Sequence, residues 1–116
     1  MPGKCVRGNV VLVNLDPTAG HEIQKTRPCV VIQNDIGNAH SPLVIVAAIE
    51  GAENVKRQYP INVVLAAGEG GLAKASVVLC NQIRTVDEIR LVKILGKLGP
   101  PSMARVDQAL KISLSL

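Results

Sequence analysis

Short runs of hydrophobic residues alternate with polar stretches along most of this 116-residue chain. The runs are rich in Val and Ile and are bounded by turn-forming residues, a pattern typical of β-strands. We therefore predict strands at residues 9–15, 29–34, 43–49, 61–65, 76–80 (continuing toward 83) and 92–98. The runs at 29–34 and 43–49 are apolar on both alternating faces, which indicates central strands covered on two sides.

The segments between the runs carry turn signals. Residues 34–42 (NDIGNAHSP) are rich in turn-forming residues, so we predict a loop there. Residues 66–71 (AAGEGG) predict a flexible turn, and residues 87–91 a short turn of helix. Pro60 opens the run at 61–65, and a proline is tolerated only at the start of a strand or at the edge of a sheet.

The C-terminal segment has the spacing of an amphipathic helix. Ser102 follows two prolines and is a good N-cap, so we predict that the helix begins there. The apolar residues that follow recur at helical spacing: Met103, Val106, Leu110 and Leu114. Closely spaced strands and one helix predict a mainly β fold, a small, partly closed antiparallel barrel with a packed C-terminal α-helix. The length predicts a single domain, residues 1–116.

Composition limits the kinds of partner. Hydrophobic residues make up 47% of the chain, but there is no Phe or Trp and only one Tyr, so the core must be aliphatic. Because Tyr59 is the only ring, base stacking cannot be the main device for binding nucleic acid. The net charge of +4 permits a phosphate-bearing partner without requiring one.

Cysteine and histidine positions argue against a metal or other cofactor. The three cysteines lack CxxC spacing, and Cys29 and Cys80 lie inside apolar runs, where a small core residue is expected. His21 and His40 are far apart and join no ligand-spaced cluster. The N-terminus lacks the apolar stretch of a signal peptide and no segment approaches a membrane span, so we expect a cytoplasmic protein.

The stretch HEIQKTRPCVVIQND, residues 21–35, places charged side chains directly before a strand. Pro28 biases Arg27 toward an extended conformation, which gives the guanidinium a defined direction. Its planar fork of donors suits a phosphate. Lys25 shares this face if the extension continues backward, and Glu22 is close enough to orient Arg27 or to carry a proton. An exposed, salt-bridged loop is the alternative that this stretch alone favours.

Two other candidates carry weaker signals. Histidine ordinarily titrates near neutrality, so His21 could shuttle a proton next to Glu22, although a single histidine on a surface loop is more often inert. The sequence GEGGLAK contains glycines and a lysine but lacks the strand–loop–helix context of a phosphate-binding loop. We interpret it as a hairpin tip.

Several motifs in the same order resemble the MazF/PemK (EndoA-type) toxin ribonucleases of toxin–antitoxin pairs. The chain has RG, an apolar strand, DPT, a G-x-E loop, and then RP with a second apolar strand. Later matches are IGNAHSPLVIVAAI, YPINVVL, SVVLCNQIRT and the terminal QALKISLSL. The resemblance therefore covers nearly the whole chain.

This resemblance implies an SH3-like (CcdB/PemK-type) barrel that forms homodimers and cuts single-stranded RNA at short sequences without a metal. The ribose 2′-OH would be the nucleophile, leaving a cyclic phosphate and a free 5′-OH. A cognate antitoxin would neutralise the protein through an acidic, partly apolar segment that folds onto its groove.

The resemblance also assigns roles to residues. Arg27 matches the catalytic arginine of the family and Glu22 its loop glutamate, while Ser76 and Gln82 match positions that line the groove. Specificity is expected in the loops around residues 16–26 and 50–58. Their basic members are the remaining candidates for RNA binding: Lys25, His21, Lys56 and Arg57.

Glu50 departs from the family pattern, which usually has Thr or Ser at this position as the companion of the catalytic arginine. Its carboxylate could act as an alternative general base, could occupy the phosphate site by pairing with Arg27, or could simply point to solvent. Asn9 also replaces the usual acidic residue after RG. We therefore expect a weakened or altered nuclease, with RNA cleavage as the leading interpretation.

A non-catalytic binding module of the same fold is the rival interpretation. CcdB-type barrel toxins bind a protein target and need no hydrolytic residues. Glu50 is the feature of this sequence that favours the rival.

Overall fold

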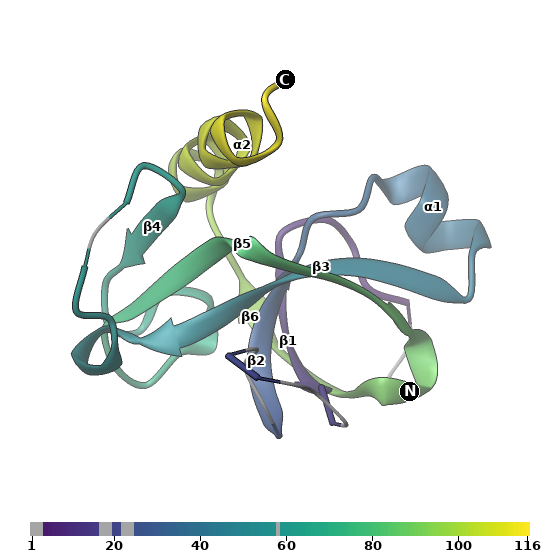
Figure 1. Ribbon diagram of the computed structural model, residues 1–116. Helices are drawn as coiled ribbons and strands as arrows, with labels where there is room; N and C mark the ends of the chain where they lie inside the picture. Colours follow the sequence, from purple (N-terminus) through teal and green to yellow (C-terminus); the bar gives the residue numbers. More distant parts are fainter. Residues whose placement is uncertain (1–3, 17–19, 22–24, 58) are drawn as a thin grey trace.

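The computed structural model describes residues 4–16, 20–21, 25–57 and 59–116 of the chain (Figure 1). The strands are β1 (Asn9–Asn14), β2 (Thr26–Val31), β3 (Leu43–Gly51), β4 (Asn62–Leu65), β5 (Ser76–Asp87) and β6 (Leu91–Lys97). The helices are α1 (Asp35–His40) and α2 (Pro100–Leu114), with 3-10 turns at Ala52–Asn54, Glu69–Gly71 and Glu88–Arg90.

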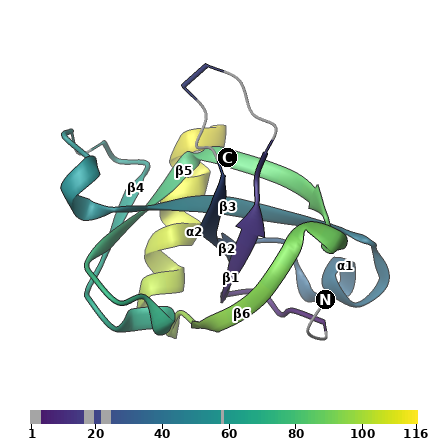
Figure 2. The same cartoon turned by 90° about the horizontal axis from the view of Figure 1, so that it is seen from below.

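All six strands form one antiparallel sheet in the order β4-β5-β3-β2-β1-β6. The sheet curls strongly, so that β6 returns toward the turn that joins β4 to β5, and α2 lies along β4 and β5 (Figures 1 and 2). The predicted fold, a small, partly closed antiparallel barrel with a C-terminal helix, is confirmed. β2 and β3 are central, as predicted, and Pro60 precedes an edge strand.

Two aliphatic cores lie on opposite faces of the central strands. In β2, Val30 packs into the core beneath α2, whereas Cys29 and Val31 pack into the barrel interior. In β3, Ile49 joins the helix side and Val46 the interior. Because side chains alternate across a strand, a run that is apolar at every position can fill both cores at once.

The open side of the barrel is closed by a glycine-rich contact instead of by strand pairing. A Cβ atom on Gly96 of β6 would lie 2.6 Å from the backbone of Gly70, and one on Gly71 only 2.2 Å from the carbonyl oxygen of Leu95. Gly71 also has a φ of +78°, a conformation that favours glycine. Only residues without a side chain allow the two backbones to approach so closely.

The segment predicted as a loop at residues 34–42 instead contains the short helix α1. Asn34 caps it by accepting a hydrogen bond from the backbone N–H of Gly37 through its side-chain oxygen, at 2.8 Å. The side chain of Asn38 is buried and donates to the carbonyl oxygen of Gln33 at 3.0 Å. Turn-forming residues therefore act here as helix caps and anchors, a use that their composition does not reveal.

Helix α2 begins earlier than predicted, because Gly99 and not Ser102 is its N-cap. Two prolines occupy the first helical positions, where the missing N–H groups would have no intrahelical partner. Ser102 is buried, and its Oγ accepts a hydrogen bond from Arg105. The buried side chains Val106 and Ala109 lie on the core face, whereas the apolar side chains of the last turn and the terminus are exposed: Ile112, Leu114 and Leu116.

The three cysteines are buried and free, which confirms the prediction for Cys29 and Cys80. Burial raises the pKa of Cys29 to about 12 and that of Cys80 to about 11, so both remain thiols at neutral pH. In the part of the chain that the structure describes, no helix has the length and apolar character needed to cross a bilayer.

We predict that Gly71→Ala destabilises the fold by more than about 2 kcal/mol, because the new methyl group would strike the carbonyl oxygen of Leu95. Gly20→Ala is the matched control, since Gly20 has a φ of +61° but open space around its Cβ position. It should cost only about 1 kcal/mol through backbone strain. Urea unfolding of both variants measures the difference, and equal losses would contradict the steric explanation.

Candidate functional site

A proline interrupts the pairing of two central strands and opens the site. The backbone N–H of Ile32, just after β2, donates to the carbonyl oxygen of Ile45 at 3.0 Å. Because hydrogen-bonding direction alternates along a strand, the backbone groups of every second residue before Ile32 also point toward β3. By this alternation Pro28 would pair with Ile49, but a proline has no N–H to donate. The pairing between the strands accordingly starts only at Cys29.

The same register brings Arg27 and Glu50 together. Cys29 pairs with Ala48, and two residues further out on the two strands are Arg27 and Glu50, on the same face of the sheet. The guanidinium Nη1 lies 3.8 Å from the carboxylate Oε1. The Arg27 side chain is 41% exposed and that of Glu50 only 18%, so a cation at the rim faces a carboxylate deeper in the gap.

The Glu50 carboxylate is held in place by its neighbours. Oε1 accepts a hydrogen bond from the backbone N–H of Gly51 at 2.9 Å and another from Nδ2 of Asn54 at 3.2 Å. Together with Arg27, three donor groups therefore approach the same oxygen. Of the three interpretations of Glu50, the one in which it points to solvent disagrees with this geometry.

A cavity of about 230 Å³ opens between the ends of β2, β3 and β5. We call it the Arg27 pocket. Its walls include Arg27, Pro28, Ile49, Glu50 and Asn54, and Lys74 and Ser76 close the other side. Backbone pairing of Ser76 with Gly51 places β5 beside the end of β3. The pocket thus combines two cations, the two carboxylates of Glu50 and Glu53, and an apolar floor.

Lys74 and Glu53 form an ion pair at the rim of the Arg27 pocket, with 2.6 Å between Nζ and Oε1. The hydrogen bond from Lys74 lowers the pKa of Glu53, so that this carboxylate stays ionised in mildly acidic solution. It is therefore poorly suited to donate a proton at neutral pH. Lys74 belongs to the GEGGLAK segment, whose sequence carries no signal that the turn folds back beside Arg27.

Ser76 lies in the Arg27 pocket, as its predicted role requires. Its side chain is buried, and Oγ donates to the carbonyl oxygen of Lys74 at 2.9 Å. The hydroxyl is thus oriented by the backbone. Its role as a contact for RNA stays a prediction.

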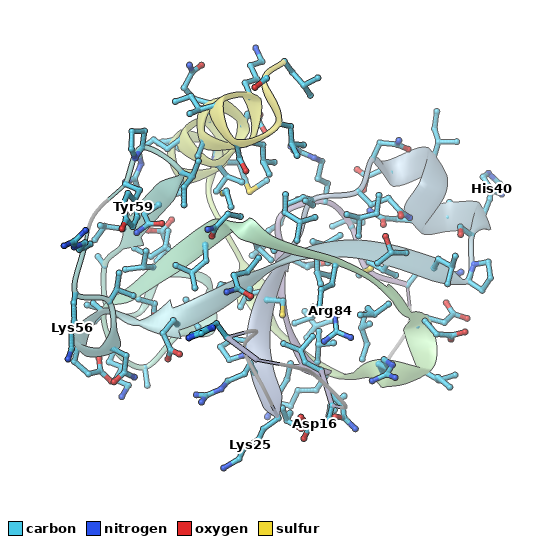
Figure 3. All side chains as sticks on the ribbon, viewed as in Figure 1. Asp16, Lys25, His40, Lys56, Tyr59 and Arg84 are labelled. Atoms are coloured by element: carbon cyan, nitrogen blue, oxygen red, sulfur yellow. The ribbon has the colours of Figure 1, made fainter. Side chains whose placement is uncertain are left out.

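Gln82 is not brought to the Arg27 pocket. It lines a separate small cavity on the barrel side of the sheet, together with Arg84, Cys29 and Leu15 (Figure 3 labels Arg84). A bulge in β5 is the cause. Ala47 and Ala48 are adjacent in β3, but their partners in β5 are Ile83 and Leu79, which are four residues apart. Such a bulge redirects the side chains that follow it, so the period of two that would place Gln82 beside Ser76 does not continue.

The predicted shared face of Lys25 and Arg27 is wrong. Lys25 has a φ of +67°, which breaks the extended conformation, and its backbone N–H donates to Oδ1 of Asp16 at 2.8 Å. Figure 3 shows Lys25 and Asp16 at the same end of the β1–β2 hairpin. Lys25 and His21 are exposed and do not line the Arg27 pocket. Glu22 lies outside the described residues.

Lys56 and Arg57 line a second cavity, of about 440 Å³, which shares Glu50 and Asn54 with the Arg27 pocket. Further residues of this second cavity that the sequence did not indicate are Tyr59, Asn62 and Asn81. They come from β4, β5 and the connection before β4, so only the pairing of the strands assembles them. Among the residues described, no three His, Cys, Asp or Glu side chains gather as a metal site would require.

We predict that Pro28→Ala extends the ladder between β2 and β3 by one pair, because the substituted residue gains an N–H that can donate to Ile49. The amide at position 28 should then exchange its hydrogen slowly, as measured by NMR in deuterated water. Pro100→Ala is the control, since an N–H at the start of α2 has no partner within the helix and should exchange rapidly. Rapid exchange at position 28 would contradict the assignment of the gap to the proline.

Comparison with known proteins places this geometry in a family. Residues 6–114 match the family model described as PemK-like, MazF-like toxin of type II toxin-antitoxin system. MazF from Deinococcus radiodurans is similar in structure, with a TM-score of 0.83, 26% identity and coverage of 98% of this chain and 99% of that chain.

Two solved complexes are also similar. A MazE–MazF complex from Deinococcus radiodurans has a TM-score of 0.77, 26% identity and 98% coverage of both chains. An endoribonuclease in complex with its cognate antitoxin from a mycobacterial species has a TM-score of 0.80 and 22% identity, over 97% of this chain and 96% of that chain. The resemblance seen in the sequence is confirmed: the chain belongs to the PemK-like, MazF-like toxins of type II toxin–antitoxin systems.

Proposed function

We propose that this protein is a toxin endoribonuclease that cleaves single-stranded RNA, including mRNA, through attack by a ribose 2′-OH and without a metal. Membership of the MazF-like toxins supports the proposal, as does a similar mycobacterial structure that is named an endoribonuclease. The observation that carries it is the Arg27 pocket, where a half-exposed guanidinium faces an anchored carboxylate 3.8 Å away.

Arg27 supplies the charge that the reaction needs. As the 2′ oxygen attacks phosphorus, negative charge builds on the oxygens of the phosphate, and a guanidinium in a fixed direction stabilises it. The bond from phosphorus to the 5′ oxygen then breaks, leaving a 2′,3′-cyclic phosphate and a 5′-OH. Arg27 is suited to this role because it lies near the start of β2 and at the rim, where a phosphodiester can approach.

Glu50 takes the proton of the 2′-OH in this proposal. The contacts that the described residues make with its carboxylate all involve Oε1, so Oε2 is the oxygen directed to accept a proton. The 5′ oxygen must receive a proton from a second group, for which Glu22 is the candidate. The same carboxylate repels the incoming phosphate, so we propose an altered and weakened nuclease compared with relatives that carry Thr or Ser.

The proposed RNA path runs from the Arg27 pocket across the second cavity. Ser76 lies in the first, and Lys56 and Arg57 in the second, where their charges can neutralise phosphates. Exposed Lys25 and His21 would add contacts at the β1–β2 connection.

A cognate antitoxin and a second copy of the chain are the proposed protein partners. Similar structures named as complexes of MazF with MazE support the first. Exposed Leu114 and Leu116, at the end of α2, support self-association, because large apolar side chains are usually covered. Since mRNA is the proposed substrate, the protein would act in the cytoplasm.

We predict that Arg27→Ala lowers the cleavage rate by about 10²-fold or more, the usual effect of removing a group that stabilises developing charge. Purified protein is incubated with a long RNA in chelator and the 5′ ends are mapped, with 5′-hydroxyl ends at discrete sites expected for the parent. Arg105→Ala is the matched control, because Arg105 is an exposed arginine on α2, away from the pocket. Equal cleavage by the Arg27 variant, with an unchanged melting curve, would refute the assignment.

We predict that Glu50→Gln lowers kcat by about 10²-fold, because it removes the base while keeping the shape of the side chain. KM should fall at the same time, since the phosphate no longer meets a like charge. Glu50→Thr tests the same point with the residue usual in the family. A rise in kcat for Glu50→Gln would show that Glu50 only inhibits.

A non-catalytic binding module is the second candidate, and the ion pair itself favours it, because a carboxylate next to Arg27 competes with a phosphate. At 3.8 Å the pair is longer than the roughly 2.7–2.9 Å of a direct charge-assisted hydrogen bond, which weakens that competition. Uncut RNA after long incubation with the parent protein would favour this second function.

A further inference from the structure

The second cavity, next to the Arg27 pocket, has the size and position of a subsite for part of a bound nucleotide. Its volume is about 440 Å³, within the range of about 300–1,000 Å³ for pockets that hold small ligands. Glu50 and Asn54 line both cavities, so a chain with its phosphate at Arg27 would reach the second one directly.

Tyr59 gives this cavity the only aromatic surface of the protein. Tyr59 is 52% exposed and belongs to neither of the two cores. Figure 3 shows Tyr59 and Lys56 on the same outer side of the molecule, along the segment that joins β3 to β4. An exposed ring at the wall of a cavity offers a flat face to one base, since every base can stack on an aromatic ring.

Three asparagine residues line the second cavity together with Tyr59. Asn81 is exposed and its side chain makes no hydrogen bond with another residue that the structure describes. A primary amide carries one acceptor and two donors, so it can pair with the edge of a base through two hydrogen bonds. Asn54 already donates to Glu50 at 3.2 Å, which leaves its side-chain oxygen as an acceptor toward the cavity.

Asn62, which also lines the second cavity, has an unused acceptor. Its Nδ2 donates to the carbonyl oxygen of Arg57 at 3.2 Å, but its Oδ1 is buried and accepts no hydrogen bond from the described residues. Buried acceptors without a donor are rare and costly in proteins. An amino group of a base in this cavity would supply the donor after a small turn of the Asn62 side chain.

We propose that the second cavity binds a single unpaired nucleobase of the RNA, stacked on Tyr59 and recognised at its edge by Asn81, next to the phosphate at Arg27. Lys56 and Arg57 hold the adjoining phosphates. The inference rests on the proposed function and deepens it, because it makes one base near the cut a determinant of sequence preference. The scarcity of aromatic residues then limits stacking to this one base.

The test uses short oligoribonucleotides with 2′-O-methyl groups, which the proposed reaction cannot cleave, and fluorescence anisotropy to measure Kd. Tyr59→Ala should weaken binding by about 5- to 150-fold, the effect of losing one stacked base. Tyr59→Phe keeps the ring and should bind like the parent. Val64→Ala is the control for a lost exposed side chain, because Val64 lies on β4 outside the cavity.

A double-substitution cycle identifies the base. Abasic sites are placed at each position of the oligonucleotide in turn, and Kd is measured for the parent and for Tyr59→Ala. At one position the abasic site should weaken binding by the parent but not by Tyr59→Ala. The variant has already lost the stacking contact that this base makes, so removing the base costs it nothing more. Losses that simply add at every position, or unchanged binding by Tyr59→Ala, would overturn the proposal.

Asn81→Ala tests recognition separately from stacking. Base changes at the position found in the cycle should alter Kd for the parent and have little effect for this variant, while changes at other positions act equally on both. Equal discrimination by the parent and the variant would refute the role of Asn81.

Failure of the subsite and failure of the proposed nuclease give different results. A parent protein that binds with the expected cycle but leaves unmodified RNA uncut would refute the nuclease and keep the base site. Normal cleavage together with unchanged binding by Tyr59→Ala would refute the base site alone. A parent that neither binds the oligonucleotides nor cuts unmodified RNA would refute both.

Discussion

The missing N–H of Pro28 is the constraint on which the candidate site depends. A proline in a central strand normally disrupts a sheet, because it cannot contribute to the ladder. Here the ladder between β2 and β3 ends at the proline, and beyond it the two strands pair only with their other neighbours, β1 and β5. The outer ends of both strands can therefore carry polar side chains at the edge of a tightly packed aliphatic protein.

The gap gives Arg27 and Glu50 two properties that an ordinary surface pair lacks. The cross-strand register places them opposite each other on one face, and hydrogen bonds from Gly51 and Asn54 hold the carboxylate. Exposed ion pairs usually add little to stability, so this pair is better understood as an arrangement of charge than as a structural support. A cation at the rim with a carboxylate behind it suits a reaction that needs both a positive charge and a proton acceptor.

The aliphatic composition shapes the rest of the molecule. Without large aromatic side chains, the two cores are filled by Val, Ile, Leu, Ala and Cys on both faces of β2 and β3. Small residues also let the turn at Glu69–Gly71 touch β6 closely at Gly96, which closes the barrel without a hydrogen-bonded strand pair. The same turn leads to Lys74, three residues beyond Gly71, which lines the Arg27 pocket.

The sequence by itself determined the strands, the two-sided burial of β2 and β3, the aliphatic core and the family, because these depend on local periodicity, composition and ordered motifs. It also singled out Arg27, Glu50 and Ser76, which the structure brings into one pocket. Tertiary structure alone decided which partners each side chain meets. The bulge in β5 turned Gln82 away, and the positive φ of Lys25 separated it from the face of Arg27.

The second cavity likewise exists only once β4 and β5 have paired, because its walls come from segments far apart in the chain. A period of two predicts a side chain's face only while the ladder is regular. Bulges, turns and strand register depend on neighbouring strands, and a linear sequence does not show which strands will be neighbours.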